Sequence, residues 1–459
     1  MRTLDQILTK KDYSRKTPAS LFYKDSPLWQ KLLAIGCVFF LSVAGLGEWK
    51  VLNGMLGGLP KAITLGVIGL AMLYTLFYPD EKRLREIWKP TLLYMSLMVA
   101  LFFWSMVIWI KSFATVSSMI RSCSKLVFQS IAILTAVALV YLFREKAIEL
   151  FTISICITNG AIMLLCIPDY GVGASIQSLI TCLVTFGDAV GYARQLEIHD
   201  LTFVFGQMIL YYAVFAPRTT RQEKRKRWLY LLACCWFFLV GMKRSAIPAV
   251  LLFILIALLL RKRKVPSWFY PAVGVCYILF FLVFLYCVRY GIISRLLNSV
   301  GVDMMGRDYL WSMANPYYEF SVTYLGHGFE YVDTIIGQWY SAGLINHPYP
   351  FHNDILKVFV EVGFPGFLLW SGIQYVLTPL FWQRYADQET TLLYLCELGY
   401  MTVTYLTDNT AFYFWSAMAL RLVTLAYAME RKKPPEPKVW MPDSRQEMRD
   451  RIRILMKEV

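Results

Sequence analysis

Charged residues are scarce in this sequence. Only 17% of its 459 residues are Asp, Glu, Lys or Arg, against about 25% in soluble domains. Hydrophobic residues make up 57% of the chain, and a soluble protein of this composition would lack polar surface. Long apolar runs recur between Leu32 and Ala428. Because roughly 20 such residues cross a bilayer core, the sequence predicts a polytopic membrane protein.

Patterns that bind metals are also missing. The chain has ten cysteines and four histidines, and their spacing is not that of a metal site. The long segment after Arg289 contains no cysteine, so a disulfide framework is excluded there. We therefore expect neither a metal nor another cofactor. The first 30 residues are polar and show no cleavable signal pattern.

The net charge of +15 raises the question of a nucleic-acid partner. The Lys and Arg residues, however, form short clusters between apolar runs, as the loops on the cytoplasmic side of membrane proteins do. No element remains free to enter a nucleic-acid groove, so we exclude nucleic acid. An anionic lipid surface or a substrate that carries phosphate remains a possible partner.

The apolar pattern predicts an all-α fold, a polytopic bundle of about twelve transmembrane helices with a large external helical loop between spans 9 and 10. The expected spans are 31–49, 61–78, 91–110, 126–143, 148–168, 199–216, 228–243, 245–260, 267–288, 364–383, 391–407 and 411–429.

Basic loops indicate which side of the membrane is cytoplasmic. Residues 81–89, 218–227 and 261–264 are rich in Lys and Arg, and they fall on one side together with both chain ends, which makes that side cytoplasmic. Segment 171–190 is apolar but rich in Gly, Ser and Thr. Counting it as a span would invert everything that follows, so we interpret it as an interfacial or re-entrant helix.

Five parts follow from these boundaries. They are a cytoplasmic N-terminal segment (1–30), spans 1–9 (31–288), an external catalytic loop (289–363), spans 10–12 (364–429) and a cytoplasmic basic tail (430–459).

All four histidines lie on or near the predicted outer side, where an outward-facing catalytic site would gather them. His352 is the strongest candidate, because an imidazole with a pKa of about 6.5 exchanges protons near neutral pH. Asn353 could orient this imidazole or hold a sugar hydroxyl, and Asp354 is the alternative orienting partner. Asn353 or Asp354 could equally cap a helix, which is compatible with catalysis.

Cations on the same side form a second group of candidates. Lys243 and Arg244 occupy a tight turn between two spans, where a cation either marks a substrate path or reaches to the interface. Arg307 begins the external stretch RDYLW, and its guanidinium suits phosphate oxygens, although a salt bridge to Asp308 would also explain it.

Three further motifs are weaker signals. His327 lies between two glycines, a pattern that also suits a simple turn. Arg194 and His199 precede a predicted span, and Asp408–Asn409 forms a polar turn between the last two spans. Ordinary loop chemistry accounts for each of these by default.

The order of the motifs resembles the O-antigen ligase and O-antigen polymerase superfamily of bacterial envelope glycosyltransferases. The matching elements are KRSA at 243–246, RDYLW at 307–311, GHG at 326–328, HN at 352–353 and GFPG at 363–366. The resemblance covers about 241–370, and each motif is distinctive only in combination with the others. YARQLEIHD at 192–200 is similar to a further family element but has His-Asp where that family often has Pro-Asn.

The resemblance implies a helical bundle whose external loop caps a cavity, and a glycan donor on undecaprenyl diphosphate at the outer leaflet. Arg244 and Arg307 would hold the diphosphate leaving group, and His352 would act as general base or orient the acceptor hydroxyl. No metal is implied. The substrate contacts that the resemblance and the motifs suggest are Lys243, Asn353, Arg194, His199 and His327.

The expected function is therefore polymerisation of lipid-linked repeat units of a capsule, exopolysaccharide or O-antigen at the bacterial cytoplasmic membrane. A ligase that moves the finished glycan onto a lipid or protein acceptor uses the same motifs. A transporter or flippase for the lipid-linked glycan fits less well, because the span interiors carry little charge. Chain-length regulator and flippase proteins are conceivable partners, besides the bilayer, the donor and the acceptor.

Overall fold

Helices are the regular elements throughout the part of the chain that a computed structural model describes, namely residues 28–56, 59–112, 115–185, 189–301, 304 and 306–431. No strand occurs among these residues. The predicted N-terminal segment up to residue 27 and the basic tail from residue 432 lie outside the described residues. The all-α prediction is thereby confirmed.

Each expected apolar stretch lies on a long or medium helix. These helices are α2 (Leu28–Leu46), α5 (Leu65–Phe77), α6 (Glu81–Ser112), α7 (Val116–Phe143), α8 (Lys146–Tyr170), α11 (His199–Leu210), α12 (Arg221–Val240), α13 (Ala246–Leu260), α14 (Phe269–Arg289), α18 (Asp354–Gly372), α20 (Gln388–Thr407) and α21 (Phe414–Arg431). Six helical stretches among the described residues are long and apolar enough to cross a membrane: α2, α6, α7, α8, α14 and Asp354–Tyr385. The protein is thus a multi-pass membrane protein, while the number of about twelve spans remains a prediction.

Shorter helices connect the long ones. They are α3 (Lys50–Leu56), α4 (Leu59–Ala62), α9 (Val172–Thr185), α10 (Tyr192–Gln195), α15 (Ile292–Ser299), α16 (Arg307–Ala314), α17 (Tyr331–Ser341) and α19 (Thr378–Tyr385), with π-helical turns at Tyr211–Phe215 and Ile373–Leu377 and a 3₁₀ turn at Asn315–Tyr317.

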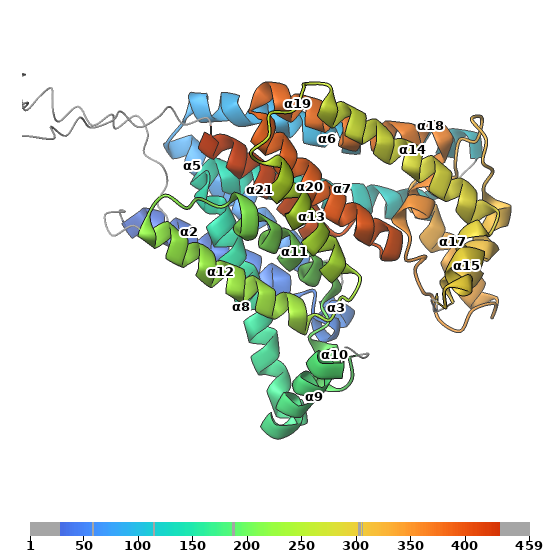
Figure 1. Cartoon of the computed structure of the whole chain (residues 1–459), viewed down its shortest axis with the longest axis horizontal. Coiled ribbons are helices and arrows are strands. Elements are labelled where there is room, and N and C mark those ends of the chain that lie inside the picture. The colour runs from blue at the N-terminus through green and yellow to red at the C-terminus, as the bar shows by residue number, and fades with distance from the viewer. Residues whose placement is uncertain are drawn as a thin grey trace, which may run out of the picture.

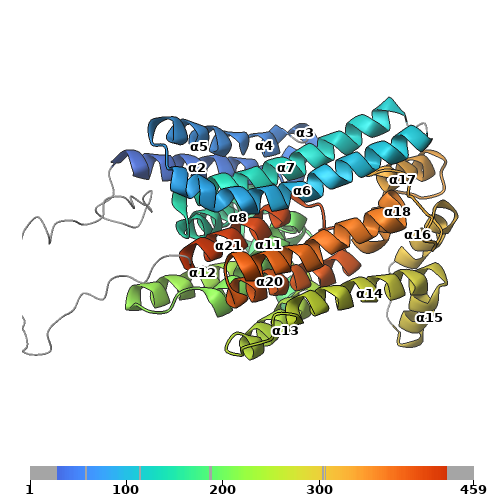
Figure 2. The ribbon, with the colours of Figure 1, turned by 90° about the horizontal axis from the view of Figure 1, so that it is seen from above.

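The long helices run side by side, so that the connections gather at two ends of the bundle (Figure 2). Helix α2 begins and α21 ends at the left of Figure 1, while α15 and α17 lie at the right. At the left end, ion pairs join connections that are far apart in sequence: Arg144–Glu86 (2.8 Å), Lys226–Glu149 (3.4 Å) and Arg261–Glu389. We call this end the basic end and the opposite one the loop end. The three basic loops of the sequence therefore meet at one end, as the topology requires.

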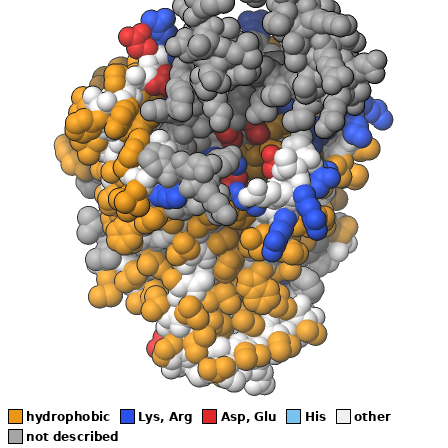
Figure 3. All heavy atoms as spheres, turned by 90° about the vertical axis from the view of Figure 1, so that its left-hand side faces the viewer, with side chains coloured by type: hydrophobic (Ala, Val, Ile, Leu, Met, Phe, Trp, Pro, Cys, Tyr) orange, Lys and Arg blue, Asp and Glu red, His pale blue; other side chains and the backbone are white. Residues whose placement is uncertain are grey.

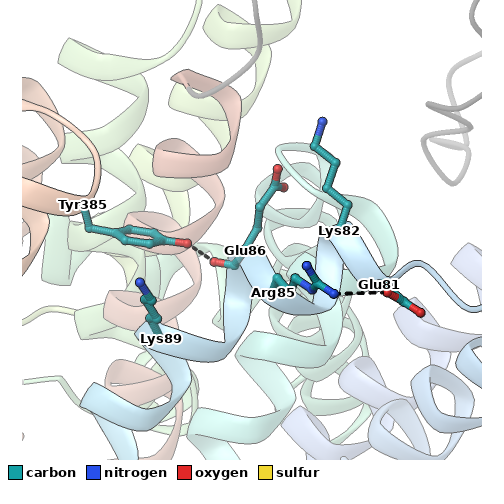
Figure 4. A pocket seen from close by; sticks show the side chains of 6 residues that line it. All are labelled: Glu81, Lys82, Arg85, Glu86, Lys89 and Tyr385. Carbon is teal, nitrogen blue, oxygen red and sulfur yellow. Dashed lines mark hydrogen bonds and ion pairs between the residues drawn. The ribbon is translucent and has the colours of Figure 1, made fainter.

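Basic side chains surround the basic end. Figure 3 looks onto it and shows Lys and Arg side chains with a few carboxylates, above a broad apolar surface. The start of α6 contributes Lys82, Arg85 and Lys89 to one pocket there, and the hydroxyl of Tyr385 donates to the backbone carbonyl of Glu86 (Figure 4). Such a band of cations next to apolar surface suits the headgroup level of a bilayer.

Helices α11, α20 and α21 fill the centre of the bundle. Nearly every side chain of α21 is buried, and this helix packs along α7 and α11. Leucines on the outer helices stay exposed instead, for example Leu232, Leu255 and Leu279, as surfaces that face lipid do. Glu397 and Arg421 are buried inside the central helices, so the spans hold more charge than the sequence analysis assumed.

Within segment 171–190, residues Val172–Thr185 form a separate helix, α9, at the loop end. Gly171, with φ +78°, ends α8 and separates it from α9. Helix α9 packs against α8 and α10. Val172, Ile176, Ile180 and Val184 form an exposed apolar stripe along it. Its 14 residues span about 21 Å at about 1.5 Å per residue, less than the roughly 30 Å of a hydrocarbon core. This length fits the expected interfacial or re-entrant helix.

The segment between α14 and α18 is fixed to α18 by close backbone contacts. Gly363 has φ +66° and kinks α18 at the point where the sequence predicted a span to begin. The next amide, of Phe364, donates to the carbonyl of Tyr324 at 2.8 Å. The amides of His327 and Gly328 both donate to the carbonyl of Glu361. The GHG and GFPG motifs therefore contact each other directly.

A buried ion cluster strengthens the same junction. Lys357 of α18 lies 3.0 Å from Asp333, 3.4 Å from Glu330 and 3.9 Å from Glu361. Its side chain is 10% exposed, and that of Glu361 is fully buried. One ammonium group thus holds carboxylates from α17, from the residue before it and from α18, so the segment between α14 and α18 cannot shift without separating these charges.

We predict that Gly363→Ala will destabilise the protein strongly. A Cβ at this position would lie 2.2 Å from the carbonyl carbon of Leu325, in a backbone conformation that only glycine adopts readily. Such strain costs at least about 2 kcal/mol, and thermal unfolding in detergent should report it. Gly372→Ala on the same helix is the control, because no atom lies within 4 Å of its added Cβ. Equal melting temperatures for the two variants would contradict the kink as described.

Candidate active site

Asp408 is the centre of a charged cluster at the loop end. It follows α20 directly, and its side chain is 9% exposed. Its carboxylate lies 3.4 Å from His352 Nδ1, 3.6 Å from Lys243 Nζ and 4.0 Å from His199 Nδ1. A second carboxylate, that of Glu197, binds Lys243 at 2.9 Å and lies 3.8 Å from His199 Nε2. Three predicted site residues therefore meet here.

The surroundings of Asp408 keep it ionised. Burial raises the pKa of this carboxyl group, but the hydrogen bond from His352 and the nearby Lys243 and His199 outweigh that effect and lower the pKa below its usual range. When His352 Nδ1 carries a proton, it donates to Asp408, which leaves Nε2 free to accept another. The side-chain nitrogen Nδ2 of Asn409 also lies 3.4 Å from Nδ1 of His352. A fixed carboxylate behind an imidazole is the arrangement that orients a general base.

The backbone around His352 is tightly held. His352 has φ +49°, an uncommon conformation for a residue other than glycine. Asn353 caps α18, because its side chain accepts from the amide of Leu356 at 3.0 Å. On the other side, Trp311 of α16 donates its indole N–H to the carbonyl of Phe351 at 2.9 Å. Contacts of the two neighbouring residues, Phe351 and Asn353, thus fix the position of the imidazole.

The Lys-Arg turn reaches the same cluster through Lys243. This turn connects α12 to α13, and the hydroxyl of Thr407 donates to that of Ser245 at 3.3 Å. Lys243 is 11% exposed and lies between its two carboxylate partners. Arg244, the next residue, is exposed. Lys243 therefore binds the two carboxylates of the cluster. Arg244 adds a second positive charge next to it, at the protein surface.

A cavity of about 540 Å³ opens in front of this cluster. The lining comes from the first half of α7, the short α4, the starts of α11 and α21 with the residues just before them, and the residues that follow α2, precede α18 and follow α20. The lining residues are Glu48, Lys61, Lys125, Phe128, Gln129, Glu197, Ile198, His199, Asp200, Pro350, His352, Asp408, Asn409, Phe412, Tyr413 and Phe414. Charged and amide side chains share this lining with four aromatic ones, a combination that suits a polar ligand with apolar faces.

Arg307 lies beside the His352 segment without lining the cavity. It is the first residue of α16, is partly buried, and stands one helical turn before Trp311. Residues four apart share a helix face, so Arg307 lies on the face of α16 that contacts Phe351. For the described residues, the structure records neither an ion pair to Asp308 nor another side-chain partner of Arg307.

The remaining predicted residues lie elsewhere or serve a local structural contact. Arg194 is exposed on α10. His327 stacks on Tyr331 with 4.2 Å between ring centroids, and its Nε2 lies 2.7 Å from the carbonyl of Tyr317. Asn353 is fully buried at the helix cap. The structure thus brings Lys243, His199 and His352 together. Arg194, His327 and Asn353 do not line the cavity.

Sequence reasoning missed several residues of the site. Glu197 was passed over within its motif, and Asp408 was treated as turn chemistry. Glu48 and Lys61 form an ion pair of 3.2 Å in the cavity wall and come from connections without any motif. Asp200 accepts from the amides of Trp415 and Ser416 at 2.8 and 2.9 Å. The available signal was charge next to apolar spans at the loop end.

Among the described residues, no three His, Cys, Asp or Glu side chains are grouped as metal ligands. The expectation that the site works without a metal remains a prediction.

Fold and site together define a class of protein: a multi-pass helical membrane protein with a histidine–aspartate pair facing a polar cavity at one end of the bundle. Residues 229–371 match the family model described as O-antigen ligase. The match confirms the resemblance to the O-antigen ligase and polymerase superfamily, and it includes the Lys-Arg turn, Arg307 and His352. No curated protein matches the chain significantly in sequence.

We predict that Asp408→Asn will weaken the cluster. Lys243 and His199 would each lose one of two nearby carboxylates, and His352 would lose its carboxylate partner. Removing one member of a largely buried charge pair should lower the free energy of unfolding by about 1–3 kcal/mol. Asp169→Asn, an exposed carboxylate at the same end, is the control. A double-mutant cycle with Lys243→Met should return a coupling of about 1 kcal/mol, and additive effects would contradict the contact.

His327 should make stability depend on pH. Burial lowers the pKa of His327, and the hydrogen bond to Tyr317 only partly opposes this. The unfolded chain, with a histidine pKa of about 6.5, then binds more protons than the folded protein. Neutral His327 therefore contributes to the free energy of unfolding above about pH 6.5, and this contribution is lost as the pH falls below that value.

Melting temperatures at about pH 7.5 and 5.5 test this prediction. His327→Gln keeps a donor for the Tyr317 carbonyl, so its melting temperature should fall less than that of the wild type over this range. An equal fall in both proteins would show that His327 does not contribute.

Proposed function

We propose that this protein is a membrane glycosyltransferase that polymerises undecaprenyl-diphosphate-linked oligosaccharide repeat units. The reaction takes place at the outer face of the bacterial cytoplasmic membrane and serves a capsule, an exopolysaccharide or an O-antigen. The observation that carries this proposal is the pair of His352 and Asp408 at the wall of the cavity.

His352 acts as the general base. The acceptor sugar binds in the cavity with one hydroxyl near Nε2 of His352. Asp408 holds the Nδ1 proton and stabilises the imidazolium that forms when Nε2 takes the hydroxyl proton. Lys243 and Glu197 keep Asp408 and His199 in place. A base held in this way needs no rearrangement at the moment of attack.

The donor reacts at its anomeric carbon. The acceptor oxygen forms a bond to this carbon while the bond to the diphosphate oxygen breaks, and the electron pair leaves with the diphosphate. Arg244 and Arg307 do not line the cavity. In the proposed reaction they hold the departing diphosphate outside it and offset its growing charge. Guanidinium groups thereby take the part that a divalent cation takes in many phosphate-transfer enzymes.

The location at the loop end suits a lipid-linked donor. The basic end carries the Lys and Arg clusters, which the positive-inside rule assigns to the cytoplasm. The loop end then faces outward, both chain ends are cytoplasmic, and the cavity opens at the depth where the diphosphate of a prenyl carrier lies. Candidate partners are a flippase that delivers the donor and a protein that regulates chain length.

A ligase is the second candidate, favoured by the description of the matching family model. It would use the same donor, the same arginines and the same base. Only the acceptor differs: a growing lipid-linked glycan for a polymerase, and a lipid core or a protein for a ligase.

We predict long glycan products when the purified wild type is incubated with repeat units on undecaprenyl diphosphate and the products are separated on a gel. Arg244→Ala, Arg307→Ala and His352→Ala should each reduce the rate by at least about 100-fold in protein that melts like the wild type. Arg295→Ala, an exposed arginine of the external segment, is the matched control and should remain active. Normal polymerisation by the three variants would refute the assignment.

Two additions to the assay separate the alternatives. Chelator should leave the rate unchanged, and a strict requirement for Mg²⁺ would contradict catalysis by arginine alone. Products that appear only when a lipid core or a protein is supplied as acceptor would identify a ligase.

A further inference from the structure

The cavity in front of His352 contains more charge than a base and its orienting partner require. Two lysines and four carboxylates line it, besides the two histidines. If this cavity holds sugars, its charges should indicate which sugars.

All four carboxylates have partners within the protein. Asp408 and Glu197 bind Lys243. Glu48 pairs with Lys61 at 3.2 Å and accepts from the indole of Trp415. Asp200 accepts from two backbone amides and from the hydroxyl of Ser416 at 2.9 Å. These groups fix the cavity walls and leave none of the carboxylates as a counter-ion for a ligand.

Lys125 differs from the other lysines of the site. It lies partly buried in the cavity wall, as the tenth residue of α7, and among the described residues no carboxylate is within ion-pair distance of its ammonium group. Glu330 and Asp333 lie near enough to interact with its charge, as does Asp354, but their direct partners are Lys357 or, for Asp354, the amide of Ala411 at 2.6 Å.

The wall around Lys125 suits a sugar ring. Phe128 and Gln129 of the same helix line the cavity with it, and Phe412 and Tyr413 lie next to them. Aromatic faces pack against the C–H groups of a pyranose, and amide and carboxylate groups bind its hydroxyls. Lys125 adds a single positive charge to this surface.

The charge balance favours a singly charged ligand over a diphosphate. Glu48 is offset by Lys61, Glu197 and Asp408 share Lys243, and Asp200 is held by hydrogen bonds, so Lys125 is the remaining positive charge of the lining. A diphosphate would bring more negative charge than this single ammonium group can offset. One sugar carboxylate matches it and gains a charge-assisted contact.

We propose that the sugar bound beside His352 is acidic, and that Lys125 holds its carboxylate. The substrate is thus a glycan whose repeat unit contains a uronic-acid-type residue. This inference rests on the proposed function and specifies its substrate class.

Binding of two soluble probes to the reconstituted full chain tests it. The probes are a disaccharide that contains glucuronic acid and the matching disaccharide with glucose in its place. Calorimetry with the wild type should show at least about tenfold tighter binding of the acidic disaccharide, the size expected for one charge-assisted contact. Lys125→Met should abolish this preference by weakening only the acidic probe, and Lys125→Arg should keep it.

Arg121→Met is the matched control, because Arg121 is exposed one turn earlier on the same helix and does not line the cavity. It removes the same charge and should leave the preference intact. The proposal is overturned if the wild type does not prefer the acidic probe, or if Lys125→Met weakens both probes alike. It is also overturned if this variant loses affinity for sugar-free undecaprenyl diphosphate while the preference persists.

The outcomes separate this inference from the proposed function. Lys125-dependent binding of the acidic probe without any glycan transfer would refute the transferase and retain the acidic-sugar site. Glycan transfer by a wild type that shows no preference would retain the transferase and refute the site.

Discussion

One carboxylate at the end of a helix organises the polar end of this protein. Asp408 lies where α20 leaves the bundle, and it is held between Lys243 and His352. A buried carboxylate is unfavourable without partners, and each of these two comes from a different connection. The Lys-Arg turn and the start of α18 are therefore held together by the same charge. The imidazole gains a fixed position because the protein has to compensate this charge.

The segment between α14 and α18 depends on a second constraint, the close approach of two backbones. Gly326 and Gly363 leave room that a Cβ would fill, which lets the chain before α17 lie directly on the kink of α18. The Lys357 cluster then ties α17 to the same helix. His352 lies at the start of α18, and Trp311 of α16 contacts the carbonyl before it. Motifs that are distant in sequence are thus parts of one rigid junction that ends at the imidazole.

Local patterns were enough to predict the helices and to place His352 at the end of the bundle opposite the basic loops. Apolar runs report helices directly, and basic loops report the end at which they gather. The partners of His352 could not be predicted in this way. Asp408 is 56 residues from His352, and Glu197 is 46 residues from Lys243, so only tertiary packing brings them together. Asn353 was the nearest polar neighbour in sequence, but its side chain caps the helix and Asp408 takes the position behind the ring.

The same packing separates two groups of cations, the arginines outside the cavity lining and the lysines inside it. Arg244 and Arg307 lie outside the cavity lining, where a polyanion can approach without facing the buried carboxylates. Inside, Lys243 and Lys61 are bound by their own carboxylates, so the cavity holds little uncompensated positive charge apart from Lys125. For the substrate proposed above, this charge distribution would keep the leaving group with the arginines and the sugar in the cavity. The anomeric carbon would then lie between them, next to His352 in the cavity wall.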